Sequence, residues 1–209
     1  SVMKSLIKTL LFIFPLFAQY PADSLFNAPK NSIFQKLLIY PITKWQRVSY
    51  NDPNVNCQFH PNCSLYGAQA IHENGSLAGL FMTSDRIVRC SPFAYKAHTK
   101  INGQYHIDGR MIDPVDLSKF SNNNKSPIFA AGLSMLIPGL GRAYSGRGPD
   151  GFLGFMISGL SINSAIKSYN QNSIFSPLWI GVAIIIYGGE VYGAYRTAKY
   201  YQVKNNIEQ

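Results

Sequence analysis

Three cysteines and a histidine are the residues of this chain that could do chemistry together. Cys57, His60 and Cys63 are spaced at intervals of three residues, and Cys90 follows later in the chain. Thiolate and imidazole groups at such short spacing are typical of a zinc site, so a set of three cysteines and one histidine is one interpretation. Two other interpretations are favoured over a metal. One is a disulfide with one spare thiol, which suits an exported domain, and the other is three structural thiols, which suit the cytoplasm. We predict no catalytic residue, since no histidine and acid pair is placed by local sequence to activate a thiol, and we predict no cofactor.

Two short helices are predicted to position these cysteines. Asn62 can cap a helix that runs to about Asn74, and Gly75 can end that helix in a left-handed conformation. Ser76 can then cap a second helix that reaches about Arg89. Because the joint between them is so short, the two helices should pack antiparallel.

The antiparallel arrangement brings the three sulfur atoms to one end of the helix pair. Cys63 lies at the start of the first helix, and Cys90 directly follows the second. Cys57 precedes Cys63 by six residues across a loop that holds Pro61. The helix lengths therefore predict a cluster of three cysteines.

The same segment resembles a known family. The run CQFHPNCSLYGAQAI, followed by GSLAGLF and RIVRCSP, resembles the YidD family of membrane protein insertion efficiency factors over about residues 32–92, and more faintly at 113–115. Besides the cysteines, the positions that match the family motif are Phe59, Pro61, Ser64, Tyr66, Gly75, Gly79, Arg86, Ile87, Arg89 and Pro92. The resemblance implies a small helical protein, held at the bacterial inner membrane by an amphipathic helix, that assists insertion of nascent membrane proteins beside the Sec translocon and the insertase. It also implies that the protein is not an enzyme.

An amphipathic helix is predicted ahead of the cysteines, with a kink at Pro41. Its apolar stripe is Phe34, Leu37, Leu38, Ile42 and Trp45. A helix lying in the lipid headgroup region fits this stripe and its basic flank, although a core-facing helix would show the same period. The candidate lipid-binding or partner-binding residues on it are Lys36, Lys44, Trp45 and Arg47. Arg86 and Arg89 share a face of the second cysteine helix and are further candidates, with a solvated basic face as the alternative.

Composition indicates a membrane as the main partner. Only 14% of residues are charged, and the formal net charge is +9. The positive charge would suit nucleic acid or an anionic bilayer, but the low charged fraction favours the bilayer, so we predict no nucleic-acid partner.

The C-terminal part is predicted to be a membrane hairpin. Long uncharged stretches predict two spanning helices, at about 150–168 and 176–196, joined by a short loop. Gly189 and Gly193 have the spacing that lets such helices approach each other closely. The apolar stretch 128–140 is short for a span and is predicted to be interfacial or re-entrant.

These features give an all-α protein with a three-cysteine domain and a transmembrane hairpin. The predicted divisions are a signal-like segment at 1–20, a helical domain at 32–117, a linker at 118–126 at the end of a polar stretch of 91–125, and a membrane domain at 127–204. The positive-inside rule places both hairpin flanks in the cytoplasm, whereas a cleaved signal would place the cysteine domain outside.

The favoured function is an inner-membrane accessory factor for protein insertion. The alternatives are an exported, membrane-tethered binding or envelope-assembly module, and a metal-binding domain.

Overall fold

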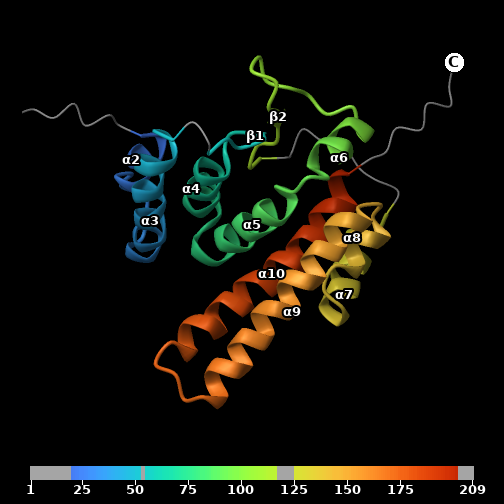
Figure 1. The fold of residues 1–209 in the computed structure, drawn as a ribbon. Coiled ribbons are helices and arrows are strands. Elements are labelled where there is room, and N and C mark those ends of the chain that lie inside the picture. The colour runs from blue at the N-terminus through green and yellow to red at the C-terminus, as the bar shows by residue number, and fades with distance from the viewer. Residues whose placement is uncertain (1–19, 53–54, 117–124, 202–209) are drawn as a thin grey trace, which may run out of the picture.

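The fold is built almost entirely from helices, as predicted. The computed structural model describes residues 20–52, 55–116 and 125–201, so the signal-like residues 1–19 lie outside the described part. The elements in chain order are α2 (Pro21–Phe26), α3 (Ile33–Ser49), β1 (Phe59–His60), α4 (Cys63–Asn74), α5 (Ser76–Arg89), α6 (Ala94–Lys100), β2 (Met111–Ile112), α7 (Pro127–Leu136), α8 (Leu140–Tyr144), α9 (Gly148–Asn170) and α10 (Ser176–Tyr200). Figure 1 shows the hairpin of α9 and α10 projecting beyond the shorter helices that carry the cysteines.

The predicted pair of cysteine helices is α4 and α5. The side chain of Asn62 caps α4 by accepting a hydrogen bond from the backbone amide of Leu65 at 2.9 Å. Gly75 joins the two helices with a φ of +85°, a conformation that favours glycine. Ser76 is the first residue of α5 and does not cap it, because Gly75 occupies the cap position itself. The helix boundaries are otherwise confirmed.

Gly79 lets α4 and α5 approach closely. A Cβ atom at this position would fall closer to the backbone of Ala70 and Ile71 than real side chains allow. Backbone atoms cannot rotate away as the end of a side chain can, so any larger residue must push the two helices apart. The positions of the cysteines at the far ends depend on the same crossing.

We expect Gly79→Ala to lower the free energy of unfolding by about 1–3 kcal/mol because of this overpacking. Thermal and denaturant unfolding, followed by circular dichroism in detergent, measures the change. Gly159→Ala is the matched control, because a Cβ at Gly159 of α9 meets nothing within 4 Å. Alanine favours helix over glycine by up to about 1 kcal/mol, so the control should be neutral or stabilising. Equal effects of the two substitutions would contradict the close crossing.

Helices α2 and α3 cover one side of α4. Their shared core includes Ala22, Ile39, Ala68 and Ile71, all of them buried. Ser32 caps α3 in a capping box with Gln35, and α3 then continues past Pro41 to Ser49. Proline removes one backbone donor but does not end this helix.

The polar stretch after Cys90 is more ordered than a linker. It holds α6 and then β2, which pairs in parallel with β1 through Phe59 and Met111. The described part of this stretch, residues 91–116, therefore belongs to the cysteine domain. Of the predicted linker at 118–126, only residues 125–126 are described.

The C-terminal helices pack against the cysteine domain through α5. Helix α10 contacts α5, α7 and α9, and the tyrosine hydroxyl of Tyr187 donates to the carbonyl of Met135 at the end of α7. Both predicted hairpin helices are present, but among the described residues only α10 has the length and hydropathy of a membrane span. Helix α7 is apolar and only ten residues long.

The prediction that Gly189 and Gly193 let the two hairpin helices approach each other named the wrong partner for these glycines. A Cβ at Gly189 would collide with Ser84 of α5, and one at Gly193 would collide with Arg142 and Asp85. These glycines therefore let α5 and α8 approach α10. The sequence spacing identified a close approach but could not show which element makes it.

Candidate functional site

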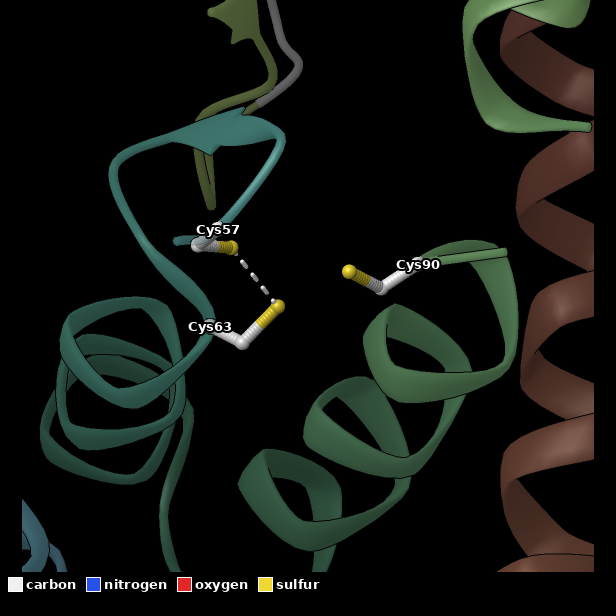
Figure 2. Close-up of side chains that lie close together, drawn as sticks. All are labelled: Cys57, Cys63 and Cys90. Carbon is white, nitrogen blue, oxygen red and sulfur yellow. Dashed lines mark hydrogen bonds between the residues drawn. The ribbon is translucent and has the colours of Figure 1, made fainter. Parts of the chain in front are cut away.

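The three cysteines converge as the helix lengths predicted. Figure 2 shows the side chains of Cys57, Cys63 and Cys90 pointing toward one another from the loop before β1, the start of α4 and the end of α5. The sulfur atoms all lie within 4.8 Å of one another, and those of Cys57 and Cys63 are 3.3 Å apart. All three are free thiols and partly exposed.

Mutual hydrogen bonds separate the acidities of the three thiols. Hydrogen bonds from Cys63 and Cys90 lower the pKa of Cys57 to about 2. The same interaction with Cys57 raises the pKa of Cys63 and the pKa of Cys90. The cluster therefore favours one thiolate, Cys57, held by two thiol donors.

His60 does not join the cysteines. Its ring stacks on His106 with the centroids 3.9 Å apart, and its Nδ1 atom lies 3.3 Å from Arg110. His106 in turn contacts Asp108 at 2.9 Å. The four-ligand set of three cysteines and His60 is therefore not assembled, because β1 directs His60 toward the loop that precedes β2.

The aromatic residues of the family motif enclose Arg86. The guanidinium carbon of Arg86 lies 4.0 Å from the ring centre of Phe59 and 4.6 Å from that of Tyr66. Arg86 also donates to the carbonyl of Pro61 at 2.8 Å. Such stacking between an arginine and aromatic rings is strong where water is excluded.

The remaining motif residues have structural positions. Ser64 accepts a hydrogen bond from Gln46 of α3 at 3.2 Å and donates to Asn62 at 3.1 Å, which ties α3 to the start of α4. Gly75 and Gly79 form the joint and the crossing described above. Pro92 is exposed beside the cysteine cluster.

The expectation that Arg86 and Arg89 form an exposed basic face is corrected by the structure. Both side chains are buried, with 0% and 2% of their surface exposed. Both donate to the carboxylate of Asp113, and Arg89 also pairs with Asp85 at 2.8 Å. Neither can reach a lipid phosphate or an exposed partner from this position, because Asp113, Phe59 and α10 enclose them.

This arrangement extends into the C-terminal helices as a buried ion cluster. We use this name for Asp85, Arg86, Arg89, Asp113, Arg142, Glu190 and Arg196. Arg142 of α8 pairs with Asp85 at 2.8 Å and with Glu190 of α10 at 3.0 Å. Arg196 of α10 pairs with Asp113. The cluster therefore joins the cysteine domain to the apolar hairpin.

The arginines hold the two aspartates of the cluster ionised. Burial alone would raise the pKa of Asp85, but Arg89 and Arg142 outweigh it and lower the pKa to about 2. Burial alone would also raise the pKa of Asp113. Arg196, Arg89 and Arg86 outweigh it and hold the pKa well below its usual range. A neighbouring pair, Arg147 with Asp150, adjoins the cluster, and Asp150 also accepts a hydrogen bond from Ser91.

The basic and aromatic candidates on α3 have mixed exposure. Trp45 and Lys44 are exposed, Lys36 is half-buried, and Arg47 pairs with Asp23 of α2 at 3.1 Å. Of these four, Lys44 and Trp45 are therefore the most accessible to a lipid or partner.

Sequence reasoning missed several members of the ion cluster. No sequence pattern pointed to Asp85 or Arg142 as members, and none predicted that Arg142 pairs with Glu190. One signal was available, since a charged residue within an apolar segment must be paired. The identity of the partner required the tertiary fold.

Comparison with known proteins identifies the family. A family model described as "Putative membrane protein insertion efficiency factor" matches residues 34–101. Relatives with this description include a Colwellia psychrerythraea protein, 42% identical over 65 residues, which are 31% of this chain and 79% of the relative. Another, from Exiguobacterium sibiricum, is 37% identical over 59 residues, which are 28% of this chain and 67% of the relative.

Other relatives match over a shorter stretch. A Rickettsia massiliae protein with the same description is 53% identical over 38 residues, which are 18% of this chain and 46% of the relative. The chain thus spans about half the length of the Rickettsia relatives that it matches. No solved structure matches the chain. Through the segment that carries α3, the cysteine cluster and α6, the chain belongs to the YidD family of membrane protein insertion efficiency factors.

Proposed function

We propose that this protein is a membrane-anchored, non-catalytic accessory factor for insertion of proteins into the bacterial inner membrane. It would act beside the Sec translocon and the insertase. The observation that carries the proposal is that the family domain and an apolar hairpin form one body, joined by the buried ion cluster. An anchor joined in this way would hold the family domain at the bilayer surface.

Helix α3 supplies a second contact with the bilayer. One face of α3 packs on α4, while the other carries apolar side chains that nothing among the described residues covers. Phe34 is 72% exposed and Leu37 is 68% exposed, and Ile33, Trp45 and Val48 are also exposed. Exposed apolar groups beside Lys44 suit the lipid headgroup region.

The hairpin is apolar but short. Its exposed surface includes Phe152, Leu160, Ile166, Phe175, Leu178 and Ile184. About 14 residues separate the start of α10 from Glu190, which is about 21 Å of helix against a hydrocarbon core of about 30 Å. With the ion cluster at the bilayer surface, the surrounding bilayer would have to thin for this apolar part of the hairpin to cross it.

The two tryptophans of the chain can test both contacts. Trp45 lies on α3, and Trp179 lies on α10, 11 residues before Glu190 and so about 16 Å along the helix. Trp179→Phe leaves Trp45 as the single tryptophan, and Trp45→Phe leaves Trp179. In vesicles with lipids brominated at chosen acyl positions, we expect Trp45 to be quenched most by shallow bromines and Trp179 most by deep bromines.

The tryptophan-free double variant supplies the background signal for this experiment. If no brominated lipid quenches the fluorescence of Trp179, then the hairpin is not a membrane anchor. If only a water-soluble quencher reduces the fluorescence of Trp45, then α3 does not contact lipid.

The insertion role is tested by depletion. We expect cells depleted of the protein to insert a reporter membrane protein more slowly, and the full chain to restore the rate. A Phe34→Gln, Leu37→Gln variant should restore it poorly, because it removes the exposed apolar face and leaves the core of α3 intact. Ile107→Gln is the matched control, since Ile107 is an apolar residue, 99% exposed, on the loop between α6 and β2 and not on α3. Unchanged insertion after depletion would reject the role.

The side of the membrane can be determined separately. A protease-sensitive tag near Asn122 should resist protease in intact cells if the cysteine domain faces the cytoplasm. Cleavage of the tag would instead support an exported, membrane-tethered module.

A further inference from the structure

We propose that Cys57, Cys63 and Cys90 form a three-thiolate site for a thiophilic d10 cation, zinc(II) or copper(I). The site lies at the open end of the α4 and α5 pair. This inference goes beyond the insertion role and does not depend on it.

The spacing of the sulfur atoms fits one bound cation. Zinc binds thiolates at about 2.3 Å, which places tetrahedral sulfur ligands about 3.8 Å apart. The three sulfur atoms lie within 4.8 Å of one another, with the shortest separation at 3.3 Å. Small side-chain rotations would therefore complete the coordination, and Figure 2 shows the three Sγ atoms facing a common point.

The donor set selects the class of cation. The three ligands are all sulfur, and the nearest candidate nitrogen ligand, His60, is engaged with His106 and Arg110. Sulfur ligands without carboxylates select soft or borderline ions over magnesium and calcium. Three ligands also leave a fourth position open, unlike the closed sites of structural zinc domains.

Charge and access support the same site. The sulfur of Cys57 lies 3.3 Å from that of Cys63, the first residue of α4, so Cys57 is close to the positive end of the helix, which favours a thiolate. Arg110 lines the same open cavity, and its positive charge interacts with Cys57. The cavity has a volume of about 780 Å³ and also borders Trp45, Tyr50 and Asn62, so an ion and a fourth ligand can enter from solvent.

The experiment uses the full chain, purified in detergent, reduced and freed of metal under anaerobic conditions. Cadmium(II) is the spectroscopic probe, with zinc(II) as its competitor and copper(I) in a separate arm. We expect one ion per chain and a thiolate-to-metal absorption that corresponds to three thiolates. Cys57→Ser, Cys63→Ser and Cys90→Ser should each weaken binding at least tenfold, whereas His60→Ala should leave it unchanged.

A measurement on the unaltered chain covers the case in which a serine variant does not fold. The bound ion should protect all three cysteines from alkylation together, as mass spectrometry of the intact chain would show. The proposal would be overturned if no ion binds in either arm, or if the ion protects fewer than three cysteines. It would also be overturned if Cys90→Ser leaves the affinity unchanged, or if His60→Ala lowers the affinity tenfold.

Discussion

Replacing Asp113 with asparagine is expected to lower the free energy of unfolding by about 3–5 kcal/mol, the cost of removing one partner from a buried ion pair. The carboxylate of Asp113 accepts from Arg86, Arg89 and Arg196. All three guanidinium groups are buried, so Arg86 and Arg196 lose their counter-charge without gaining water, while Arg89 keeps Asp85. Asparagine has nearly the same shape, which confines the change to charge and hydrogen bonding.

Asp108→Asn is the matched control for this prediction. Asp108 pairs with Arg110 and His106 on an exposed loop, and such surface pairs contribute about 0–1 kcal/mol. Both variants are measured by denaturant unfolding in detergent under identical conditions. If Asp113→Asn costs no more than Asp108→Asn, the ion cluster does not stabilise the fold as described.

The same carboxylate connects two halves of the chain that sequence analysis treated as separate domains. Arg86 and Arg89 belong to the family motif, whereas Arg196 belongs to the hairpin. We therefore expect Asp113→Asn to increase hydrogen exchange in α10 as well as in α5. Exchange confined to α5 would indicate that the hairpin docks through other contacts.

The cysteine cluster could be predicted from the sequence because its determinants are local. Asn62 and Gly75 define the ends of α4, and two helices of similar length with a one-residue joint must meet again at their far ends. Capping and helix rise depend on a few neighbouring residues, so they can be read without the tertiary fold.

The environment of Arg86 and Arg89 could not be predicted in the same way. Helical spacing shows that two residues share a face, but it does not show what covers that face. Here the cover comes from α10, about a hundred residues later in the chain, and from Asp113, within a stretch whose composition resembles a linker. Strands of two residues, such as β2, are also too short to produce a recognisable alternation of apolar and polar residues.

Arg142→Met is the second substitution with a large expected effect, a loss of about 3–5 kcal/mol in the free energy of unfolding. Arg142 lies between Asp85 of α5 and Glu190 of α10, and none of its surface is exposed. Without it, two carboxylates face each other in a buried site. The loss should appear in denaturant unfolding and should exceed that of Arg47→Met, whose partner Asp23 lies in a partly exposed pair.

The double variant Arg142→Met, Glu190→Met separates the charge effect from the packing effect. It removes both members of one pair, while Asp85 keeps Arg89 as its partner at 2.8 Å. Replacing a buried ion pair with apolar residues is often neutral, so we expect the double variant to recover most of the stability lost in the single variant. The coupling energy from the full double-mutant cycle should be at least about 1 kcal/mol. Strictly additive losses would mean that Arg142 stabilises the junction by packing alone, and that charge pairing does not hold the hairpin against the cysteine domain.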